Sequence, residues 1–356
     1  VYTGSAAAGP ALEGQQIERG MLAAPGALSE IEITDKGWRC YILDETLAPQ
    51  PGDIVDPVTG NVVEEGPMHG KAVGITGTGV IAALANGMKT GVINTPKILT
   101  EDGLLHLQDG INVSSADVEE AGKAIGALRA GFLTLLDAAG LWIDDVQKAY
   151  MSGASGLYVD ARKAMEIGMV TPGARRIVQF GNTSITMARQ LILGDVSLDD
   201  LKAFANKLKA QHVMFATSDF FKDVYSIEYS LWCSSMPMDQ YSEMMGCYGH
   251  KGIPEAVDTS TVEVNKLAVR DLPDVDNLKV SIIKSGTLLS GELEACIGCM
   301  KCVKKCPEKA LTIEPVGVSG YRAVIESDRC AGTACKRCEK ACPKKTLNTD
   351  RLKMAQ

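Results

Sequence analysis

The stretch Cys296-Ile297-Gly298-Cys299-Met300-Lys301-Cys302-Val303-Lys304-Lys305-Cys306-Pro307 places four cysteines at gaps of two, two and three residues and follows them with a proline. Ferredoxins of the bacterial type use this spacing to hold a cubic [4Fe-4S] cluster. The short gaps turn consecutive thiolates inward from one loop, whose backbone N–H groups hydrogen-bond the sulfurs. The stretch therefore predicts an iron–sulfur centre inside a small α+β domain.

A second cysteine run repeats the pattern, with two more residues in its first gap and again a proline, Pro343, after its last cysteine. In two-cluster ferredoxins the fourth cysteine of each run ligates the cluster of the other run. Carried onto this chain, that exchange predicts two sets of metal ligands. The first set is Cys296, Cys299, Cys302 and Cys342, and the second is Cys330, Cys335, Cys338 and Cys306. Between the runs, residues 311–313 and 323–325 predict a small hairpin.

Two other uses of these cysteines stay open, a structural zinc site and a disulfide framework. Structural zinc sites do not repeat this spacing with a following proline, so we favour two clusters. Two clusters in one small domain indicate electron transfer, with a purely structural role as the alternative. Lysines surround the cysteines, and we expect them either to attract an acidic redox partner or to offset the negative charge of the clusters. They are Lys301, Lys304, Lys305, Lys336, Lys340, Lys344 and Lys345.

The composition of the chain is that of a folded protein of two or three domains. It has 356 residues, of which 46% are apolar and 22% charged, and this excludes a disordered chain. The net charge of -8 argues against a nucleic-acid partner. No stretch reaches the roughly 18 uncharged apolar residues that a membrane helix needs, and the given residues show no basic and apolar segments of the kind expected for a signal peptide. We therefore expect a cytoplasmic protein without a membrane partner. Because the chain starts at Val1 without a methionine, we expect an N-terminal part to be missing.

Ahead of the cysteines, residues 1 to about 200 alternate short β-type runs, glycine turns and helical patterns, as is typical of an α/β domain. Ser114-x-x-Asp117 predicts a capping box at the start of a long helix that ends at Gly140. Other helices are expected over 160–167, 183–193 and 198–210, and strands over 31–33 and 146–151. We divide the chain into an α/β domain over 1–210, an irregular connecting region over 211–285 and a ferredoxin domain over 286–356.

Three loops of small residues, at 4–14, 74–79 and 153–156, each precede a helical pattern in the α/β domain. Glycine lets the backbone approach a phosphate closely, and the following helix N-terminus supplies N–H donors and a favourable dipole. None of the loops matches the P-loop pattern or the dinucleotide-binding pattern GxGxxG. Taken singly, each is a weak signal, and an ordinary turn between a strand and a helix is the commoner explanation.

Taken together and in order, these loops resemble a known family. The run over 5–14, Gly74-Ile75-Thr76-Gly77-Thr78-Gly79, the run over 150–160, Gly168, and Gly181-Asn182 resemble the ATPase domain of reductive activators of corrinoid proteins. That domain belongs to the ASKHA group of actin, Hsp70 and sugar kinases. With a two-cluster ferredoxin domain behind it, the chain is similar to the activators that serve methylamine methyltransferase corrinoid proteins in methanogenic archaea. The resemblance covers about residues 1–195 and 290–345.

The resemblance implies an ATP-dependent oxidoreductase that returns an inactive Co(II) corrinoid protein to Co(I) in methylamine-dependent methanogenesis. Its implied cofactors are two [4Fe-4S] clusters and ATP with Mg²⁺, and its implied partners are the corrinoid protein and a low-potential electron donor. No catalytic residue is assigned. By position, the candidates for the nucleotide cleft are Gly74, Thr76, Gly77, Thr78, Gly79, Gly153, Ala154, Ser155 and Gly156.

Two departures from the family pattern bear on ATP. Where the family reads Gly-Gly-Phe-Gly, this chain has Gly153-Ala154-Ser155-Gly156, and the phosphate motifs of the first lobe are absent. We therefore expect this chain to hydrolyse ATP poorly by itself. Two other functions stay open. One is an activator of 2-hydroxyacyl-CoA dehydratases, which the eight C-terminal cysteines disfavour because those activators are single-cluster homodimers. The other is an electron carrier whose α/β domain only docks a partner.

Two clusters of residues outside these motifs have alternative interpretations. Cys233, Cys247 and His250 either ligate a metal or are ordinary packed side chains. The methionines between them either form an adaptable docking surface or fill gaps in the core, and the second is the commoner use of methionine. They are Met236, Met238, Met244 and Met245.

Overall fold

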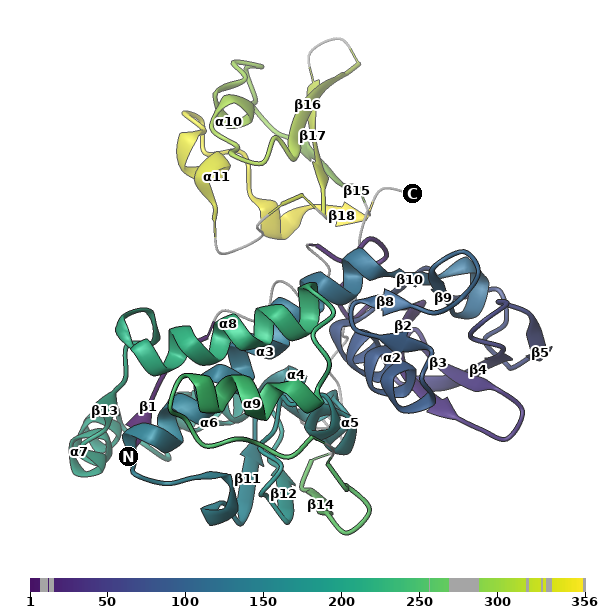
Figure 1. Ribbon diagram of the computed structural model, residues 1–356. Coiled ribbons are helices and arrows are strands. Elements are labelled where there is room, and N and C mark those ends of the chain that lie inside the picture. The colour runs from purple at the N-terminus through teal and green to yellow at the C-terminus, as the bar shows by residue number, and fades with distance from the viewer. Residues whose placement is uncertain are drawn as a thin grey trace. The chain divides into compact units, whose positions relative to one another are not determined.

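The computed structural model divides into two compact units, Val1–Asn277 and Leu278–Gln356, and each is described by itself (Figure 1). It describes residues 1–6, 12, 16–255, 257–268, 288–317, 320–327, 329–330 and 335–354. Most of the small-residue loop over 4–14 lies outside these residues. Among the described residues, no helix is both long enough and apolar enough to cross a membrane.

The first unit contains a mixed, mainly antiparallel sheet whose strand order is β5-β4-β3-β2-β6. Its strands are β2 (Ala27–Ile33), β3 (Trp38–Leu43), β4 (Pro49–Val55), β5 (Val62–Glu64) and β6 (Gly74–Ile75). The last strand, β6, runs parallel to β2 and leads into α2 (Gly77–Thr90), which packs on β2. The Thr76 hydroxyl caps α2 by accepting from Gly79 N, and Gly91, in the left-handed region at φ 75°, ends it.

Short strands and one long helix lie outside the two larger sheets of this unit. The short strands are β1 (Tyr2–Thr3), β7 (Ile93–Asn94), β8 (Lys97–Ile98), β9 (Leu104–His106), β10 (Asn112–Ser114) and β13 (Gln211–His212). The long helix is α3 (Ser115–Ala138), and the predicted capping box is confirmed, because the Ser114 side chain and the Asp117 side chain bond each other's backbone N–H.

A parallel sheet of order β11-β12-β14 forms the second half of this unit. Its strands are β11 (Lys148–Met151), β12 (Arg176–Gln179) and β14 (Glu263–Lys266), and its helices are α4 (Gly153–Tyr158), α5 (Ala161–Glu166), α6 (Thr183–Leu193) and α7 (Leu198–Leu208). Asp160 caps α5, and Gly194, at φ 79°, ends α6. The helices predicted over 160–167, 183–193 and 198–210 are therefore present within two residues of their expected bounds.

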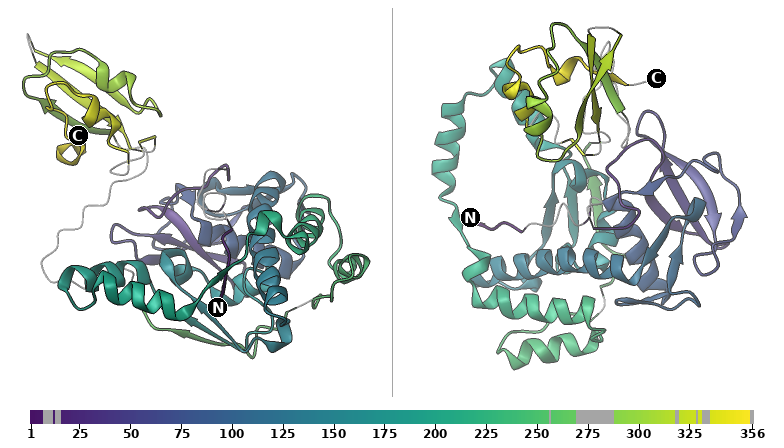
Figure 2. Two further views of the ribbon diagram at one scale, coloured as in Figure 1. Left: turned by 90° about the vertical axis from the view of Figure 1, so that its left-hand side faces the viewer. Right: turned by 90° about the horizontal axis from the view of Figure 1, so that it is seen from above.

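The region predicted as irregular, 211–285, contains two regular helices where it is described. These are α8 (Asp219–Cys233) and α9 (Asp239–Cys247), and Trp232 and Tyr241 on them are fully buried. The prediction was wrong because the helical spacing of the buried Val224, Ile227 and Leu231 is masked by the polar and aromatic residues between them. Figures 1 and 2 show α3, α8 and α9 side by side.

A buried ion pair joins these three helices. The guanidinium of Arg129 on α3 lies 3.2 Å from the carboxylate of Glu228 on α8, and both side chains are at most 8% exposed. The Tyr241 hydroxyl on α9 and the Trp232 indole, at 3.2 Å, donate to the same carboxylate. A second Arg129 nitrogen donates to the carbonyl of Ile167 at 2.8 Å. The pair is fully hydrogen-bonded, as a buried charge requires.

The second unit is a small antiparallel sheet with two short helices, the α+β arrangement that its cysteine runs predict. The strand order is β16-β17-β15-β18. The elements are β15 (Leu288–Leu293), α10 (Lys301–Lys304), β16 (Leu311–Val316), β17 (Gly320–Glu326), α11 (Arg337–Ala341) and β18 (Lys353–Met354). The predicted hairpin is the β16–β17 pair, in which Ile313 lies opposite Ala323. Its core contains Leu293, Leu311, Ile313, Ala323, Ile325 and Leu347.

The two halves of this unit repeat the same backbone around their cysteines. Left-handed residues precede the third cysteine of each run by two positions, at Met300 (φ 56°) and Lys336 (φ 45°). Others follow the fourth cysteine by three positions, at Lys309 (φ 53°) and Lys345 (φ 52°). Such conformations are uncommon for residues other than glycine, so their recurrence at matching positions identifies an internal repeat.

Candidate functional site

The eight clustered cysteines line two separate cavities of the second unit. Apolar side chains such as Leu293, Ile313 and Leu347 surround the first cavity, and Thr346 also lines it. Its cysteines are Cys296, Cys299, Cys302 and Cys342. Glu308, Lys336 and Thr349 line the second cavity. Its cysteines are Cys306, Cys330, Cys335 and Cys338.

Each cavity thus receives three cysteines from one run and the fourth from the other run. Cys302 on α10 and Cys338 on α11 are the third cysteines of their runs and lie at matching places in the internal repeat. Their partners Cys306 and Cys342 end the respective runs and cross to the opposite cavity. The structure brings together the two sets that the exchange rule predicts, while ligation of iron stays a prediction.

The other uses of these cysteines fit the geometry poorly. All eleven cysteines are free, so a disulfide framework is excluded for this structure. A zinc ion, with Zn–S bonds of about 2.3 Å, needs sulfurs about 3.8 Å apart. Within the part of the chain that the structure describes, no three of the cysteine sulfurs lie within 4.8 Å of one another. The wider spacing suits a cluster in which each thiolate binds a different iron.

The surroundings of the thiols differ within each set. Burial raises the pKa of Cys302 and of Cys338, and the backbone N–H groups of Val303 and Glu339 offset part of that rise. Burial also acts to raise the pKa of Cys342, but the backbone N–H of Leu347 and the side chain and backbone of Thr346 outweigh it and lower that pKa. The Thr346 hydroxyl oxygen lies 3.7 Å from the Cys342 sulfur.

The loop over 74–79, one of the two that contain the predicted nucleotide residues, is packed into the core of its own unit. Gly74, Thr76 and Gly79 are buried, and the Thr76 hydroxyl donates to the carbonyl of Leu28 at 3.2 Å. The Thr78 hydroxyl donates to the carbonyl of Ser29 at 2.8 Å. These side chains attach the start of α2 to strand β2.

Close packing explains the glycines of this loop. A Cβ atom on Gly77 would lie 2.4 Å from the carbonyl oxygen of Leu12, and one on Gly79 would lie 2.5 Å from that of Leu28. Both positions therefore require glycine whether or not a phosphate binds nearby.

The second predicted loop is accessible. Ala154 and Ser155 are exposed at the start of α4, and Gly153 has the left-handed φ of 88°. The N–H of Gly153 donates to the carbonyl of Gly181 at 2.9 Å, which ties this loop to the end of the neighbouring strand β12. A Cβ atom on Gly153 would meet nothing within 4 Å, so glycine is favoured here by the left-handed backbone conformation and not by close packing.

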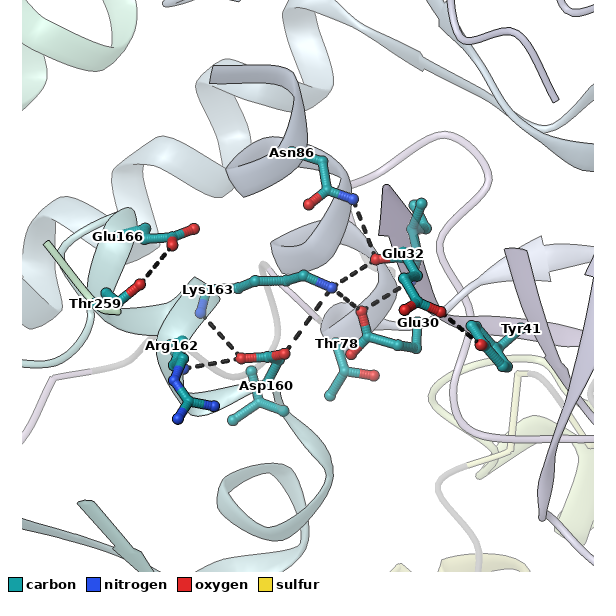
Figure 3. Close-up of polar contacts among 12 residues, drawn as sticks. Glu30, Glu32, Tyr41, Thr78, Asn86, Asp160, Arg162, Lys163, Glu166 and Thr259 are labelled. Carbon is teal, nitrogen blue, oxygen red and sulfur yellow. Dashed lines mark hydrogen bonds and ion pairs between the residues drawn. The ribbon is translucent and has the colours of Figure 1, made fainter. Parts of the chain in front are cut away.

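A cavity of about 680 Å³ lies between α2, α5 and residues 257–260, and none of the nine predicted nucleotide residues lines it. Lys163 is one of the residues that line this cavity. Its Nζ contacts the Glu30 carboxylate and lies 2.5 Å from the carbonyl of Ile31 (Figure 3). Asn86 donates to the same carbonyl at 3.1 Å. Burial raises the pKa of Glu30, and the charge of Lys163 acts against that rise.

Sequence reasoning did not find this arrangement, because Glu30 and Lys163 are 133 positions apart in the sequence. One local signal was present: Asp160 accepts from the backbone N–H groups of Arg162, at 2.8 Å, and Lys163, at 3.1 Å, as an N-cap does. Across the cavity, Thr259 donates to Glu166 at 2.8 Å. Each of these contacts joins elements of the first unit, and we assign them no chemistry.

The alternatives left open for α8 and α9 are resolved by packing. His250 lies 3.1 Å from the Asp223 carboxylate, and among the described residues Cys233, Cys247 and His250 do not form a group close enough to hold a metal. Among the described residues, Asp53, His69 and Asp109 do have their ligand atoms within 4.8 Å of one another. The two carboxylates accept backbone N–H groups, Asp53 from Gly66 and Asp109 from Ala72. Met245 is fully buried, and the other three methionines pack against the core, as gap-filling methionines do.

Comparison with known proteins identifies both units. Residues 1–242, more than half of the chain, match the family model described as the C-terminal domain of RACo, the ASKHA domain. Residues 295–346 match the 4Fe-4S dicluster domain. These matches confirm the predicted fold class, an actin- and Hsp70-like α/β domain followed by a ferredoxin-type α+β domain. The ASKHA match also includes α8, which lies in the region first expected to be irregular.

A curated relative covers nearly the whole chain. It is the [Co(II) methylated amine-specific corrinoid protein] reductase of Methanosarcina barkeri, 44% identical over 338 residues, which are 94% of this chain and 61% of the relative. This chain therefore spans less than two thirds of that protein's length.

Among solved structures, a reductive activator for a corrinoid, iron-sulfur protein is similar over 65% of this chain and 38% of its own. The two are 22% identical, with a TM-score of 0.47, a level that does not define a fold by itself. The family matches and the curated relative are sufficient: this chain belongs to the family of reductive activators of corrinoid proteins, and it carries their ASKHA domain joined to a 4Fe-4S dicluster domain.

Proposed function

We propose that this chain is the electron-transferring part of an ATP-dependent reductase that returns a corrinoid protein from Co(II) to Co(I). The observation that carries the proposal is the gathering of eight cysteines into two sets of four in a chain that also contains an ASKHA domain. Its relative is named as a reductase of the corrinoid protein specific for methylated amines, which supports the same class of target for this chain. The setting would be methylamine-dependent methanogenesis.

In this proposal the first set of cysteines holds one [4Fe-4S] cluster and the second set holds another. When bound, such clusters accept and release single electrons at potentials that their surroundings tune. The cysteines supply the thiolates, and the N–H groups of the α10 and α11 turns hold those sulfurs in place. The donor is oxidised by one electron, and that electron reduces Co(II) to Co(I). The transfer requires no bond between the protein and the cobalt.

The charge of the second unit supports docking of acidic redox partners. Residues 291–356 hold 13 basic and 8 acidic residues, whereas the whole chain carries a net charge of -8. Lys301, Lys304, Lys305 and Lys344 are exposed close to the cysteines. Such a basic surface raises the rate of encounter with an acidic partner and makes it sensitive to salt. We propose no role for nucleic acid or a membrane.

The ASKHA domain supports the ATP dependence. Reduction of Co(II) at low potential is uphill for many donors, and each 59 mV costs a factor of about ten in a one-electron equilibrium. Binding of ATP with Mg²⁺ shifts the balance between two conformations if it favours one of them. The loop over 153–156 is the more accessible candidate for contact with the nucleotide, and the buried loop over 74–79 acts by fixing the start of α2. The requirement for reduced thiols favours a cytoplasmic location.

The test uses the full-length protein, reconstituted anaerobically with iron and sulfide and mixed with a Co(II) corrinoid protein and a strong reductant. The Co(I) absorption band is followed with and without ATP. We expect Co(I) to accumulate only when ATP is present. If both clusters are reduced normally and no methylamine-type corrinoid protein yields Co(I), the corrinoid target is wrong. If Co(I) forms equally fast without ATP, the nucleotide dependence is wrong.

A further inference from the structure

One hydroxyl group points at one ligand sulfur of the second unit. The Thr346 Oγ1 lies 3.7 Å from the Sγ of Cys342, within the range of a hydrogen bond to sulfur, and Thr346 lines the first cavity beside that cysteine. A thiolate bound to iron has no proton to give, so in a loaded centre the hydroxyl is the donor and the sulfur the acceptor.

The internal repeat shows what stands at the matching place in the other half. Thr346 follows the fourth cysteine of its run by four positions, and Ala310 follows Cys306 by four. The residues before them, Lys309 and Lys345, share the left-handed backbone, so the two positions are structurally equivalent. Ala310 has no hydroxyl, and the sulfur of Cys306 therefore lacks the donor that Cys342 has.

The second cavity has a threonine of its own, but its hydroxyl is engaged elsewhere. Among the described residues that line this cavity, Thr349 is the one with a hydroxyl side chain. That hydroxyl donates to the carboxylate of Glu339 at 2.5 Å, and the Thr349 N–H donates to the same oxygen at 2.7 Å. The Glu339 carboxylate therefore accepts the hydrogen bond of the Thr349 hydroxyl, and among the described residues of this cavity no side-chain hydroxyl is directed at a sulfur.

We propose that Thr346 is a positioning residue that sets the reduction potential of one centre only, the one held by Cys296, Cys299, Cys302 and Cys342. This inference rests on the proposed function, since it requires two clusters. Reduction adds negative charge that the ligand sulfurs share, and a hydrogen bond to a sulfur stabilises the reduced state more than the oxidised state. The Thr346 hydroxyl therefore raises the potential of its own centre and leaves the potential of the centre that contains Cys306 in place.

The test is a redox titration of the reconstituted full chain, followed by electron paramagnetic resonance and requiring no partner protein. Thr346→Val removes the hydroxyl at constant shape, and Thr346→Ser keeps it. The matched control is Thr312→Val, because Thr312 is an exposed threonine of the same domain whose hydroxyl lies 3.5 Å from the carbonyl of Val324, away from both cavities. Ala310→Ser is the reciprocal variant.

We expect Thr346→Val to shift one of the two midpoint potentials to a more negative value and leave the other in place. Thr346→Ser and Thr312→Val should keep both potentials, and Ala310→Ser should raise the potential that Thr346→Val leaves alone. A Thr346→Val chain with both potentials unchanged, or with both shifted equally, overturns the inference while the two clusters stand. An unsubstituted chain without two cluster signals overturns the proposed function and this inference with it.

Discussion

Lys163 on α5 and Glu30 on β2 form an ion pair that joins the two halves of the first unit, and the pair is largely withdrawn from solvent, with side chains 16% and 29% exposed. Lys163 also binds the carbonyl of Ile31, so it holds the strand by its backbone as well as by its charge (Figure 3). The sheet that contains β2 and the helix α5 therefore have a specific electrostatic connection.

Lys163→Met should lower the free energy of unfolding of the first unit by about 1–3 kcal/mol, because it leaves a largely buried carboxylate without its cation. All three tryptophans, Trp38, Trp142 and Trp232, lie in this unit, so urea unfolding followed by tryptophan fluorescence measures it. The pKa of Glu30 is already raised by burial and should rise further in the variant. A raised carboxyl pKa favours the folded state as the pH falls toward 4.5, so the deficit should be largest at neutral pH and shrink in acid.

The control for Lys163 is Lys202→Met. Lys202 pairs with Asp199 at 3.2 Å, but both side chains are almost fully exposed, and such pairs contribute about 0–1 kcal/mol. A loss as small in Lys163→Met as in this control would contradict the importance of the connection.

Gly168→Ala should disrupt the buried pair of Arg129 and Glu228. Gly168 has φ 90°, and a Cβ atom there would lie 1.8 Å from the guanidinium by which Arg129 pairs with Glu228, so that guanidinium would have to move. Displacing one partner of a buried pair costs about 3–5 kcal/mol. Gly194→Ala isolates the backbone cost, because Gly194 has φ 79° and no neighbour within 4 Å, and it should cost about 1–2 kcal/mol. Equal losses in the two variants, measured by urea unfolding, would show that the steric conflict is relieved.

His69 should titrate above its ordinary pKa of 6.5, because its Nδ1 lies 2.8 Å from the buried carboxylate of Asp53. The stabilisation from charged His69 is complete below pH 6.5 and is lost as the pH rises through the raised value. The chain has four histidines, so proton NMR of the imidazole signals, with His69→Gln for assignment, resolves this titration. Asp53→Asn should return the His69 pKa toward 6.5, and an unchanged midpoint in that variant would show that the Asp53 carboxylate is not what raises it.

Cys299→Ser and Cys335→Ser should each remove one of the two proposed clusters. Two cubic clusters carry about eight irons per chain, so the iron content after anaerobic reconstitution should fall to about four in either variant. Cys247→Ser is the matched control, since Cys247 is an exposed cysteine outside both cavities. Full iron content in either of the first two variants would remove that cysteine from the ligand set.

What the sequence predicted correctly was carried by local patterns. Ser114 and Asp117 specify a helix start by themselves, and the bounds of α6 follow from Asn182 and Gly194 next to it. The grouping of the eight cysteines depends on gaps of a few residues, and the structure gathers the same sets. The helix ends depend on near neighbours in the chain, as do three cysteines of each set, and the exchange rule for two-cluster ferredoxins adds the fourth cysteine.

What the sequence missed depends on contacts between distant segments. Nothing near Lys163 indicates that Glu30 lies beside it. The glycines over 74–79 have the same local pattern whether they admit a phosphate or pack on a carbonyl, and only the position of Leu12 and Leu28 shows the packing role. The helix α8 was hidden because its buried face carries Glu228, a charged residue that is neutralised by Arg129 from another helix.

The exchange of Cys306 and Cys342 between the two cavities has a consequence for how the domain is made. On the proposed assignment, the first centre lacks its fourth ligand until Cys342 has been synthesised, long after Cys302, and the second centre takes Cys306 from the half made earlier. Neither half holds a complete ligand set alone, so iron and sulfide are inserted after translation of both halves. Each complete centre then links the two halves covalently through its iron. Because each run also supplies one cysteine to the other centre, oxidative loss of one centre removes a constraint on the loop that ligates its neighbour.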